Sequence, residues 1–468
     1  MASYWIETMG CQMNERDSET IAGLLEREGY ARAAAADAAD VLVVNTCSVR
    51  ENADNRFFGL LGHLKAVKDA RPEAVVAVCG CMMQQAHIVE RIREKHGWVD
   101  LVFGTHNIHE LPEMLAAAGG RMPPLHPNEA AGDGAAGRGG LRGKVHVRAA
   151  REAIVEGLPA RRAYGFKAYV NIMVGCNNFC SYCIVPYVRG REMSREPEAV
   201  LDEVRALAES GTKEVMLLGQ NVNSYAGFSG RSVSFPELLR AVDAVPGIER
   251  VRFMTSHPKD LSEDLIALFE RGAGGAARGR GLAHLCPSIH LPVQAGSSRV
   301  LARMNRRYTK EAYLRLVEKL RAANPEIVIT TDFIVGFPGE TEDDFAETMD
   351  LIERVRYDAA FTFLYSPREG TPAAAYPDQV DEAAAHARFD RMVARLNEIS
   401  LEKNRRLVGR VEQVLVEGPA RTGEGMLAGR TFSGRLVNFP GEKVAPGDIV
   451  AVRITDAKTF SFGGELVE

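Results

Sequence analysis

The sequence AYVNIMVGCNNFCSYC, residues 168–183, joins a largely apolar run to three closely spaced cysteines. The run Ala168–Val174 is typical of a β-strand, so the cysteines stand on the loop that follows it. Helical segments such as Pro197–Ala208 and Glu342–Val355 alternate with further candidate strands. Six strand–helix units of this length predict a parallel, partial (β/α)6 barrel. The remaining candidate strands are Glu214–Leu218, Val251–Thr255, Ser288–Pro292, Ile327–Phe333 and Ala360–Tyr365.

Cys176, Cys180 and Cys183 form a C-x3-C-x2-C pattern. Three thiolates on one tight loop can hold three irons of a [4Fe–4S] cluster and leave the fourth iron open. An open iron can chelate the amino and carboxylate groups of S-adenosylmethionine, and an electron from the cluster can then cleave its C–S bond to give a carbon radical. A structural zinc site is the alternative, but it normally needs four ligands, and no fourth lies nearby in the sequence.

In the N-terminal part of the chain, cysteines again follow directly after predicted strands. Apolar runs at Ser3–Thr8, Val41–Asn45 and Val75–Val78 each end just before a cysteine. Such runs predict parallel strands that are buried on both faces, in a Rossmann-like α/β domain. Because ligands gather at the carboxyl ends of parallel strands, we expect the cysteines that follow these strands to form a second cluster site. These cysteines are Cys11, Cys47, Cys79 and Cys81.

A helix is predicted between the first two of these strands. Asp17 or Ser18 can cap its N-terminus, and Gly29 can end it. Its apolar face is formed by Ile21, Leu24 and Leu25.

Composition and charge limit the class of protein. The chain has 468 residues, a net charge of −5 and eight cysteines. This length predicts more than one domain. The acidic balance argues against a generally basic nucleic-acid binder, so any RNA contact must come from a local patch. No stretch approaches the ~20 apolar residues that span a bilayer, and the N-terminus lacks the features of a secretory signal. We therefore expect a cytoplasmic protein.

Two stretches rich in glycine interrupt these patterns. GDGAAGRGGLRG lies in a region that we interpret as a linker, and GAGGAARGRG, from Gly272, reads as a surface loop. The last part of the chain alternates short β-like runs with Gly/Pro turns, for example Val411–Val416 and Ile449–Ile454. This pattern predicts a small antiparallel β-barrel.

The stretch GCNNFCSYCIVPYVRGREMSR, Gly175–Arg195, closely resembles the radical-SAM methylthiotransferases. The resemblance covers nearly the whole chain, and the C-terminal part is similar to the TRAM domain. It implies four segments: an N-terminal methylthiotransferase domain (1–118), a linker (119–161), a radical-SAM core (162–404) and a TRAM-like domain (405–468). The other matching motifs are TMGCQMNERDSE, NTCSVRENA, GCMMQ, GQNVNSY, SHPKDL, LPVQAGSSRVL, DFIVGFPGET and LVNFPGEKV.

The resemblance also implies two [4Fe–4S] clusters. Cys176, Cys180 and Cys183 would hold the cluster that exchanges with S-adenosylmethionine. Cys11, Cys47 and Cys81 would hold an auxiliary cluster, with Cys81 preferred because Gly80-Cys81-Met82 matches the family motif. Cys79 is a possible competitor, since residues 79 and 81 lie on the same face of a strand. Cys286 has no motif around it, and we interpret it as a small buried apolar residue.

Several other side chains allow two interpretations, contact with a ligand or a structural role. Gly336, Pro338, Gly339 and Glu340 resemble the loop that borders S-adenosylmethionine, or they form an ordinary strand-to-helix turn. Gln220 and Asn221 end the second barrel strand, where they would contact the cofactor or cap the loop. Arg189, Arg191 and Arg195 would bind tRNA phosphates or the cofactor carboxylate, or remain solvated. His257 and His290 would face the cavity or serve the structure.

The resemblance implies a tRNA-modifying transferase. The members most similar in GQNVNSY and GRTFSGRLVNFPGE methylthiolate C2 of N6-(dimethylallyl)adenosine next to the anticodon of tRNA. Sister enzymes act on threonylcarbamoyladenosine of tRNA or on a ribosomal-protein aspartate, and these are the alternatives. One S-adenosylmethionine would supply the methyl group and a second the radical. A flavodoxin- or ferredoxin-like electron donor is implied, and we expect a monomer without membrane contact.

Overall fold

The computed structural model describes residues 1–48, 53–119, 145–149, 153–228, 230–272 and 275–467. The chain divides into two compact units. The first unit contains Met1–Ala163 together with Val174–Asn177 and Ile184–Met193. The second unit contains Tyr164–Met173, Asn178–Cys183 and Ser194–Glu468. The predicted domain boundaries stay predictions, because the two units interleave along the chain at the cysteine loop.

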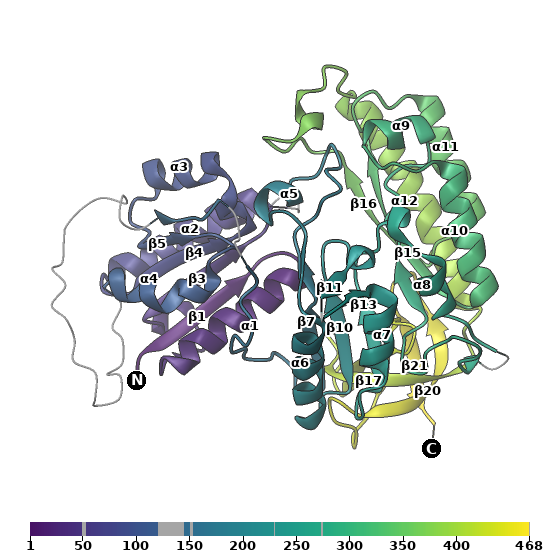
Figure 1. The fold of residues 1–468 in the computed structure, drawn as a ribbon, viewed down its shortest axis with the longest axis horizontal. Helices are drawn as coiled ribbons and strands as arrows, with labels where there is room; N and C mark the ends of the chain where they lie inside the picture. Colours follow the sequence, from purple (N-terminus) through teal and green to yellow (C-terminus); the bar gives the residue numbers. More distant parts are fainter. Residues whose placement is uncertain (49–52, 120–144, 150–152, 229, 273–274, 468) are drawn as a thin grey trace. The chain divides into compact units, whose positions relative to one another are not determined.

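The first unit is built on a six-stranded parallel sheet with the strand order β2-β1-β3-β4-β5-β6 (Figure 1). Apolar cores cover both faces of the sheet, which explains why every residue of β3 (Val41–Thr46) and β4 (Val75–Gly80) is buried. The predicted Rossmann-like α/β class and its first three strands are confirmed. The other elements are β1 (Ser3–Thr8), α1 (Gln12–Arg27), β2 (Ala31–Arg32), η1 (Ala36–Ala38), α2 (Ala53–Ala70), η2 (Cys81–Gln84), α3 (Ala86–Lys95), β5 (Leu101–Phe103), η3 (Ile108–Glu110), α4 (Leu111–Ala117) and β6 (Val145–His146).

Helix α1 begins earlier than its sequence predicts. Its N-cap is Cys11, and the amide of Asn14 donates to the Cys11 carbonyl at 2.9 Å. The prediction that Asp17 or Ser18 caps the helix is therefore wrong. Both residues lie inside the helix, where their side chains bond to other parts of the first unit. Gly29, with a φ of 83°, follows the end of the helix as predicted.

The second unit contains the predicted partial barrel. Its six parallel strands form two three-stranded sheets, β13-β10-β7 and β14-β15-β16. A parallel bridge between Val251 and Leu285 continues the hydrogen bonding from β13 toward β14. All six predicted strands are confirmed, with ends that differ by a few residues because the bends at the barrel mouth interrupt pairing. The strands are β7 (Lys167–Asn171), β10 (Glu214–Leu218), β13 (Arg250–Phe253), β14 (Ser288–His290), β15 (Val328–Val335) and β16 (Ala359–Leu364).

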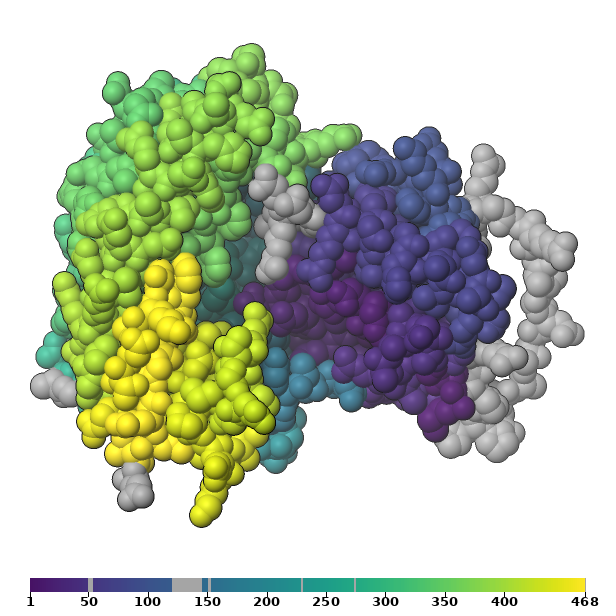
Figure 2. All heavy atoms as spheres, turned by 180° about the vertical axis from the view of Figure 1, so that it is seen from behind, coloured from purple at the N-terminus to yellow at the C-terminus, as the bar shows by residue number. Residues whose placement is uncertain are grey.

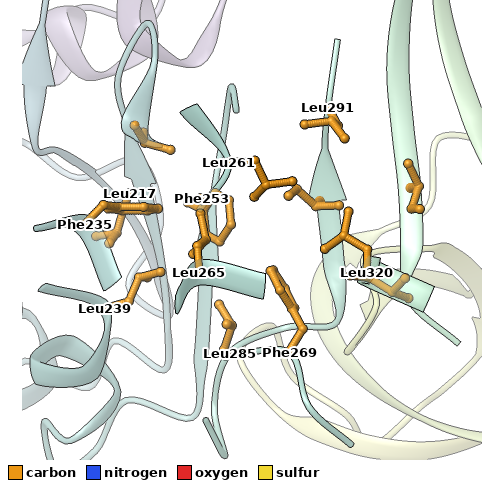
Figure 3. Packing of buried hydrophobic residues seen from close by; sticks show 14 of the residues in the cluster. Leu217, Phe235, Leu239, Phe253, Leu261, Leu265, Phe269, Leu285, Leu291 and Leu320 are labelled. Atoms are coloured by element: carbon orange, nitrogen blue, oxygen red, sulfur yellow. The ribbon is translucent and has the colours of Figure 1, made fainter. Parts of the chain in front are cut away.

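Helices pack against the outer face of these strands. Figure 3 shows Leu217 of β10 and Phe253 of β13 beside Phe235, Leu265 and Phe269 from the helical layer. The Phe235 and Phe253 rings meet edge to face, with centroids 5.1 Å apart. The helices are α6 (Pro197–Glu209), α7 (Phe235–Asp243), α8 (Glu263–Ala267), α9 (Ser298–Arg303), α10 (Lys310–Ala323), α11 (Glu342–Val355) and α12 (Glu382–Arg405). Short elements are β8 (Met173–Val174), α5 (Val185–Val188), β9 (Met193–Ser194), η5 (Val222–Ser224), β11 (Ala226–Phe228), β12 (Ser232–Ser234), η6 (Pro258–Asp260) and η8 (Pro372–Ala375).

The C-terminal residues form the predicted small barrel, which is closed and five-stranded in the order β17-β18-β19-β21-β20. Figure 2 shows this barrel in yellow against the green part of the second unit. Two arginines of β13 fix it: Arg250 donates to the carbonyls of Gln413 and Arg430, and Arg252 donates to the carbonyl of Thr431. The strands are β17 (Val411–Pro419), β18 (Met426–Thr431), β19 (Leu436–Pro440), β20 (Ile449–Ala457) and β21 (Phe462–Leu466).

The two glycine-rich stretches are described only in part. Residues 120–144, which include GDGAAGRGGLRG, lie outside the described residues, but the predicted linker also contains β6, which pairs with β5. Of the second stretch, residues 273 and 274 lie outside the described residues. Residues 275–280 are exposed, as a surface loop requires. Among the described helices, none is long and apolar enough to cross a membrane.

Candidate iron–sulfur and cofactor sites

The C-x3-C-x2-C loop is held in a tight conformation by its own backbone and by the segment after α9. The amide of Cys183 donates to the Cys180 carbonyl at 2.9 Å, which closes a turn between two of the predicted ligands. Phe179 adopts a φ of 47°, and its carbonyl accepts a 2.9 Å bond from the Asn305 side chain. The Ser181 amide donates to the Met304 carbonyl at 3.0 Å. The loop conformation is therefore fixed by protein contacts.

A buried cation lies beside the loop. Arg306 is 4% exposed, and its Nη1 is 3.4 Å from Cys180 Sγ and 3.3 Å from the Tyr182 hydroxyl. Burial raises the pKa of Tyr182 well above its ordinary value; Arg306 opposes this, whereas Cys180 and Cys183 add to it. The Cys180 sulfur therefore lies next to a buried guanidinium, and hydrogen bonds to ligand sulfurs are among the means by which a protein tunes an iron–sulfur cluster.

Polar atoms without partners gather where the barrel strands end. Asn171 Oδ1 belongs to the last residue of β7, Gln220 Oε1 and Asn223 Oδ1 follow β10, and Ser256 Oγ and His257 Nε2 follow β13. All five atoms are buried and have no hydrogen-bond partner among the described residues. Buried polar atoms are normally satisfied, so this group indicates a place for a polar ligand. The C-terminal ends of parallel barrel strands are where such ligands bind.

The same region contains backbone strain and a neutral histidine. Thr255 has a φ of 71°, which is costly for a β-branched residue and is typical of functional sites. Burial lowers the pKa of His257 to about 2, and Arg306 and Lys259 contribute to this shift. His257 is thus uncharged at physiological pH. His290 bonds instead to Thr330 at 3.0 Å and lies 3.4 Å from Asp332, which supports its structural reading.

The predicted cofactor contacts separate into two groups. Gln220 presents an unpartnered oxygen, whereas the Asn221 amide is occupied: it donates to Asp260 at 2.7 Å and accepts from the His257 backbone at 3.1 Å. The Glu340 carboxylate accepts bonds from the Gly336 amide at 2.8 Å and from Arg388 at 3.2 Å. Asn221 and Glu340 therefore hold their own loops, and their contacts with the cofactor stay predictions.

The loop at Gly336–Glu340 depends on its glycines. Gly336 and Gly339 have φ values of 74° and 77°, which other residues rarely adopt. Burial raises the pKa of Glu340, and the Gly336 amide and Arg388 oppose this effect. Cofactor contacts of Gly336, Pro338 and Gly339 stay predictions.

The first unit brings Cys11, Cys47 and Cys81 to one edge of its sheet. A Cβ atom on Gly10, whose φ is 112°, would lie 2.7 Å from Cys47 Sγ, so this glycine allows the Cys11 loop to approach Cys47. Burial raises the pKa of the Cys81 thiol to about 12; Arg189 opposes the shift, and Cys47 and Cys11 add to it. The three sulfurs are thus close enough to influence one another.

Cys79 points elsewhere. It packs in the apolar core between the sheet and helices α1 and α4 and is fully buried. Strand β4 ends at Gly80, whose φ is 95°, and Cys81 begins the 3-10 helix η2. The expectation that residues 79 and 81 share a face is therefore wrong. A side chain on Gly80 would lie 2.4 Å from the Thr46 carbonyl, so only glycine permits this turn.

Asn14 connects the three cysteine loops. Its Nδ2 donates to the Met9 carbonyl at 2.8 Å and to the Thr46 carbonyl at 2.7 Å, just before Cys11 and Cys47. Its Oδ1 lies 3.8 Å from Cys81 Sγ. Asn14 lies inside the motif TMGCQMNERDSE, but its role could not be predicted, because Thr46 and Cys81 are distant from it in the sequence.

The three arginines after the cysteine loop have different environments. Arg189 is 5% exposed and contacts Cys81, Asn14 and Asp17 within the first unit. Arg195 donates to the Asn171 carbonyl and pairs with Glu203 at 2.6 Å. Neither Arg189 nor Arg195 is a solvated charge, so that interpretation is wrong for these two residues, and their contacts with phosphate or with the cofactor stay predictions. Arg191 is exposed.

Among the described residues, no group of three or more His, Cys, Asp or Glu side chains is arranged to hold a single metal ion. A [4Fe–4S] cluster is larger than one ion, and its ligand sulfurs stand further apart. The donor sets do fit this cluster: three cysteines at one sheet edge, and three on one loop beside Arg306. Cys286 is 1% exposed, so its predicted burial is confirmed, but Arg250, Arg252 and Glu214 lie near it and its surroundings are not purely apolar.

Comparisons with known proteins show which families the chain resembles. Residues 170–352 match the model of the Radical SAM superfamily, residues 405–467 that of the TRAM domain, and residues 3–104 that of the Uncharacterized protein family UPF0004. Solved structures of the radical S-adenosylmethionine methyltransferase TsrM from Kitasatospora setae and of the cobalamin-dependent enzyme OxsB share the fold. Their TM-scores are 0.53 and 0.52, with 16% and 13% identity. The alignments cover 92% and 85% of this chain and 81% and 56% of those chains.

Curated relatives extend the match to the full chain. The tRNA-2-methylthio-N(6)-dimethylallyladenosine synthase of Alkaliphilus oremlandii is 48% identical over 99% of this chain and 93% of its own length. The enzyme of the same name from Clostridium botulinum (strain Okra / Type B1) is 48% identical over 99% of this chain and 97% of its own. The chain therefore belongs to the family of the tRNA-2-methylthio-N(6)-dimethylallyladenosine synthases, which are radical-SAM methylthiotransferases.

Proposed function

We propose that this protein methylthiolates C2 of N6-(dimethylallyl)adenosine next to the anticodon of tRNA. The observation that carries this proposal is that six of the eight cysteines fall into two sets of three. One set lies at the mouth of a radical-SAM barrel and the other at the edge of a parallel sheet. A C2–H bond of adenine is not acidic, so acid–base chemistry cannot readily exchange that hydrogen for sulfur. Two iron–sulfur clusters in one chain would provide a radical route for this exchange.

We assign Cys176, Cys180 and Cys183 to the cluster that exchanges with S-adenosylmethionine, and Cys11, Cys47 and Cys81 to the auxiliary cluster. When bound, these groups supply a 5′-deoxyadenosyl radical, which removes the C2 hydrogen, and the methylthio group that replaces it. Arg306 lies against the Cys180 sulfur, where it would donate an N–H···S bond to this ligand. Asn14 fixes the loops that carry Cys11 and Cys47.

The barrel mouth provides the polar contacts for the cofactor. The unpartnered oxygen of Gln220 and the unpartnered Nε2 of His257 would bind its amino, hydroxyl or adenine groups. Gly336, Pro338 and Gly339 would border it from the loop after β15. Because His257 stays neutral, it can orient a ligand without adding charge to the site.

Nucleoside mass spectrometry tests this function. Reconstituted protein is incubated anaerobically with prenylated tRNA, S-adenosylmethionine and a reductant, and a new methylthio-prenyl-adenosine is expected. A Cys47→Ala variant should still release 5′-deoxyadenosine but make no product. If wild-type protein cleaves S-adenosylmethionine without making this product, the substrate assignment is wrong. Threonylcarbamoyladenosine tRNA and the ribosomal-protein aspartate would then be tested.

The tRNA substrate implies that the anticodon-loop base leaves its stack to enter the barrel mouth. The C-terminal barrel, which matches the TRAM domain, would contact the RNA. We further propose a flavodoxin- or ferredoxin-like electron donor, a monomeric enzyme and a cytoplasmic location. Reduction of the clusters by purified flavodoxin, and the mass of the protein in solution, would test the first two.

A further inference from the structure

Arg189 lies six residues after the C-x3-C-x2-C motif but belongs to the first unit. The segment Ile184–Met193 is anchored there by several contacts. Thr105 Oγ1 donates to the Val188 carbonyl at 2.9 Å, and Ile184 and Val188 pack against Cys81. The chain that carries one set of cysteines therefore continues directly into the site of the other set.

The Arg189 guanidinium is aimed at the sulfur of Cys81. Its Nε donates to Cys81 Sγ at 3.1 Å, its Nη2 donates to Asn14 Oδ1 at 2.6 Å, and its Nη1 lies 2.7 Å from Asp17 Oδ2. Each of the three nitrogens has a separate partner, so the orientation of the plane is fixed. A planar fork with a fixed orientation is what distinguishes arginine from lysine at such a site.

Burial of the Arg189 charge costs desolvation free energy, which its partners must offset. Arg189 is 5% exposed, Asp17 is 8% exposed and Asn14 is fully buried. A buried ion pair gains little stability compared with an apolar pair of similar volume, so it is weak evidence for a structural role. The direction of Nε toward a predicted cluster ligand instead indicates an electrostatic role.

We propose that Arg189 is a positioning residue of the auxiliary cluster: it donates a charge-assisted N–H···S bond to the Cys81 ligand and raises the reduction potential of that cluster. This inference rests on the proposed ligand set Cys11, Cys47 and Cys81. Hydrogen bonds to ligand sulfurs and nearby positive charge stabilise the reduced, more negative form of an iron–sulfur cluster. Asp17 and Asn14 hold the guanidinium in place.

The test uses the full chain with Cys176, Cys180 and Cys183 changed to alanine, so that only the auxiliary cluster is present. Electron paramagnetic resonance during redox titration gives its midpoint potential. Adding Arg189→Gln should lower the reduced-to-oxidised ratio at a fixed potential by about tenfold, which is about 59 mV for a one-electron couple. Arg252→Gln is the matched control, because it breaks another buried pair, at 2.9 Å from Glu214 in the second unit.

A shift in Arg189→Gln without one in Arg252→Gln supports the proposal, and equal potentials in both variants and the parent overturn it. A second measurement needs no substitution of Arg189. The reduced cluster should show a hyperfine coupling to nitrogen. This coupling should be that of ¹⁴N in unlabelled protein and that of ¹⁵N in protein made with ¹⁵N-labelled arginine. Absence of this coupling overturns the proposal even if Arg189→Gln does not fold. If the parent protein binds no iron, the ligand set of the proposed function is wrong, and this inference falls with it.

Discussion

The two cysteine sites differ in how the chain assembles them. Cys176, Cys180 and Cys183 lie within eight residues on one loop, whereas Cys11, Cys47 and Cys81 follow three different strands. The first site is fixed by a turn of its own backbone and by contacts with the segment after α9. The second exists only once β1, β3 and β4 have paired in register. A local site depends on its loop, and a dispersed site depends on the whole sheet.

The largest effect is expected at the local site. Cys180→Ala should abolish the formation of 5′-deoxyadenosine and of product, because the cluster that binds S-adenosylmethionine loses a ligand. Liquid chromatography with mass spectrometry measures both compounds. The auxiliary cluster should survive, so about half of the iron should remain. Cys286→Ala is the control: this buried thiol should be dispensable for both activities. Normal cleavage in Cys180→Ala would contradict the assignment.

A pair of neighbouring cysteines tests the dispersed site. Cys81→Ala should stop methylthiolation while leaving 5′-deoxyadenosine formation in place. Cys79→Ala should retain product, because Cys79 packs in the core between the sheet and its helices. The measurement is the ratio of methylthio-prenyl-adenosine to 5′-deoxyadenosine in each variant. The opposite pattern would move the third ligand from Cys81 to Cys79.

The dispersed site should also depend on a residue that binds no iron. Asn14→Ala leaves the Met9 and Thr46 carbonyls without a donor, so the affinity for the auxiliary cluster should fall by about 10- to 100-fold. Iron and sulfide content after dilution into a chelator measures this affinity. Asn404→Ala is matched, since the Asn404 amide also donates to two carbonyls, those of Lys458 and Thr459, but in the second unit. Equal losses in both variants would indicate general destabilisation instead.

The smallest effect concerns the stability of the barrel and its dependence on pH. Asp344, in the first turn of helix α11, completes a capping box with the N-cap residue Thr341 and bonds to Arg299 and Ser297; although burial opposes the effect, these partners lower the pKa of its carboxyl. A lowered pKa in the folded state stabilises the protein above the ordinary pKa of aspartate, and this contribution is lost as the pH falls below it. Asp344→Asn should therefore cost about 1–2 kcal/mol at pH 7. The cost should shrink below about pH 4.

Thermal unfolding of the iron-free protein at a series of pH values measures this difference. Glu342→Gln is a useful comparison on the same helix turn, because its side chain is largely exposed and pairs with Arg388 and Arg391. Its effect on stability should be smaller at every pH. A constant difference between Asp344→Asn and the parent from pH 7 to pH 3 would contradict the assigned pKa direction.

The sequence predicted the local site almost completely, because its information lies within a few residues. The C-x3-C-x2-C spacing, the preceding strand and the following helices all follow short-range patterns. The three sheet strands and the closed C-terminal barrel were predicted for the same reason. The ends of the six barrel strands were less accurate, since bends at the mouth depend on tertiary packing.

The parts that could not be predicted depend on contacts between distant segments. Arg189 was predicted either to bind a phosphate or carboxylate or to remain solvated, but its partners Cys81 and Asp17 lie more than a hundred residues away in the sequence. The partners of Asn14 are also spread along the chain, from Met9 to Arg189. The resemblance selected Cys81 rather than Cys79, but the turn at Gly80 that separates the two side chains could not be predicted from the apolar run before it. Asp17 was expected to cap a helix and instead pairs with Arg189.

The joint between the radical-SAM barrel and the C-terminal barrel has an evolutionary consequence. Arg250 and Arg252 donate hydrogen bonds to the main-chain carbonyls of Gln413, Arg430 and Thr431. Main-chain carbonyls are present whichever side chains these positions carry. Mutation can therefore alter the outer surface of the small barrel without loosening its attachment. A module held in this way is free to adapt to new RNA shapes while the catalytic scaffold that carries it stays constant.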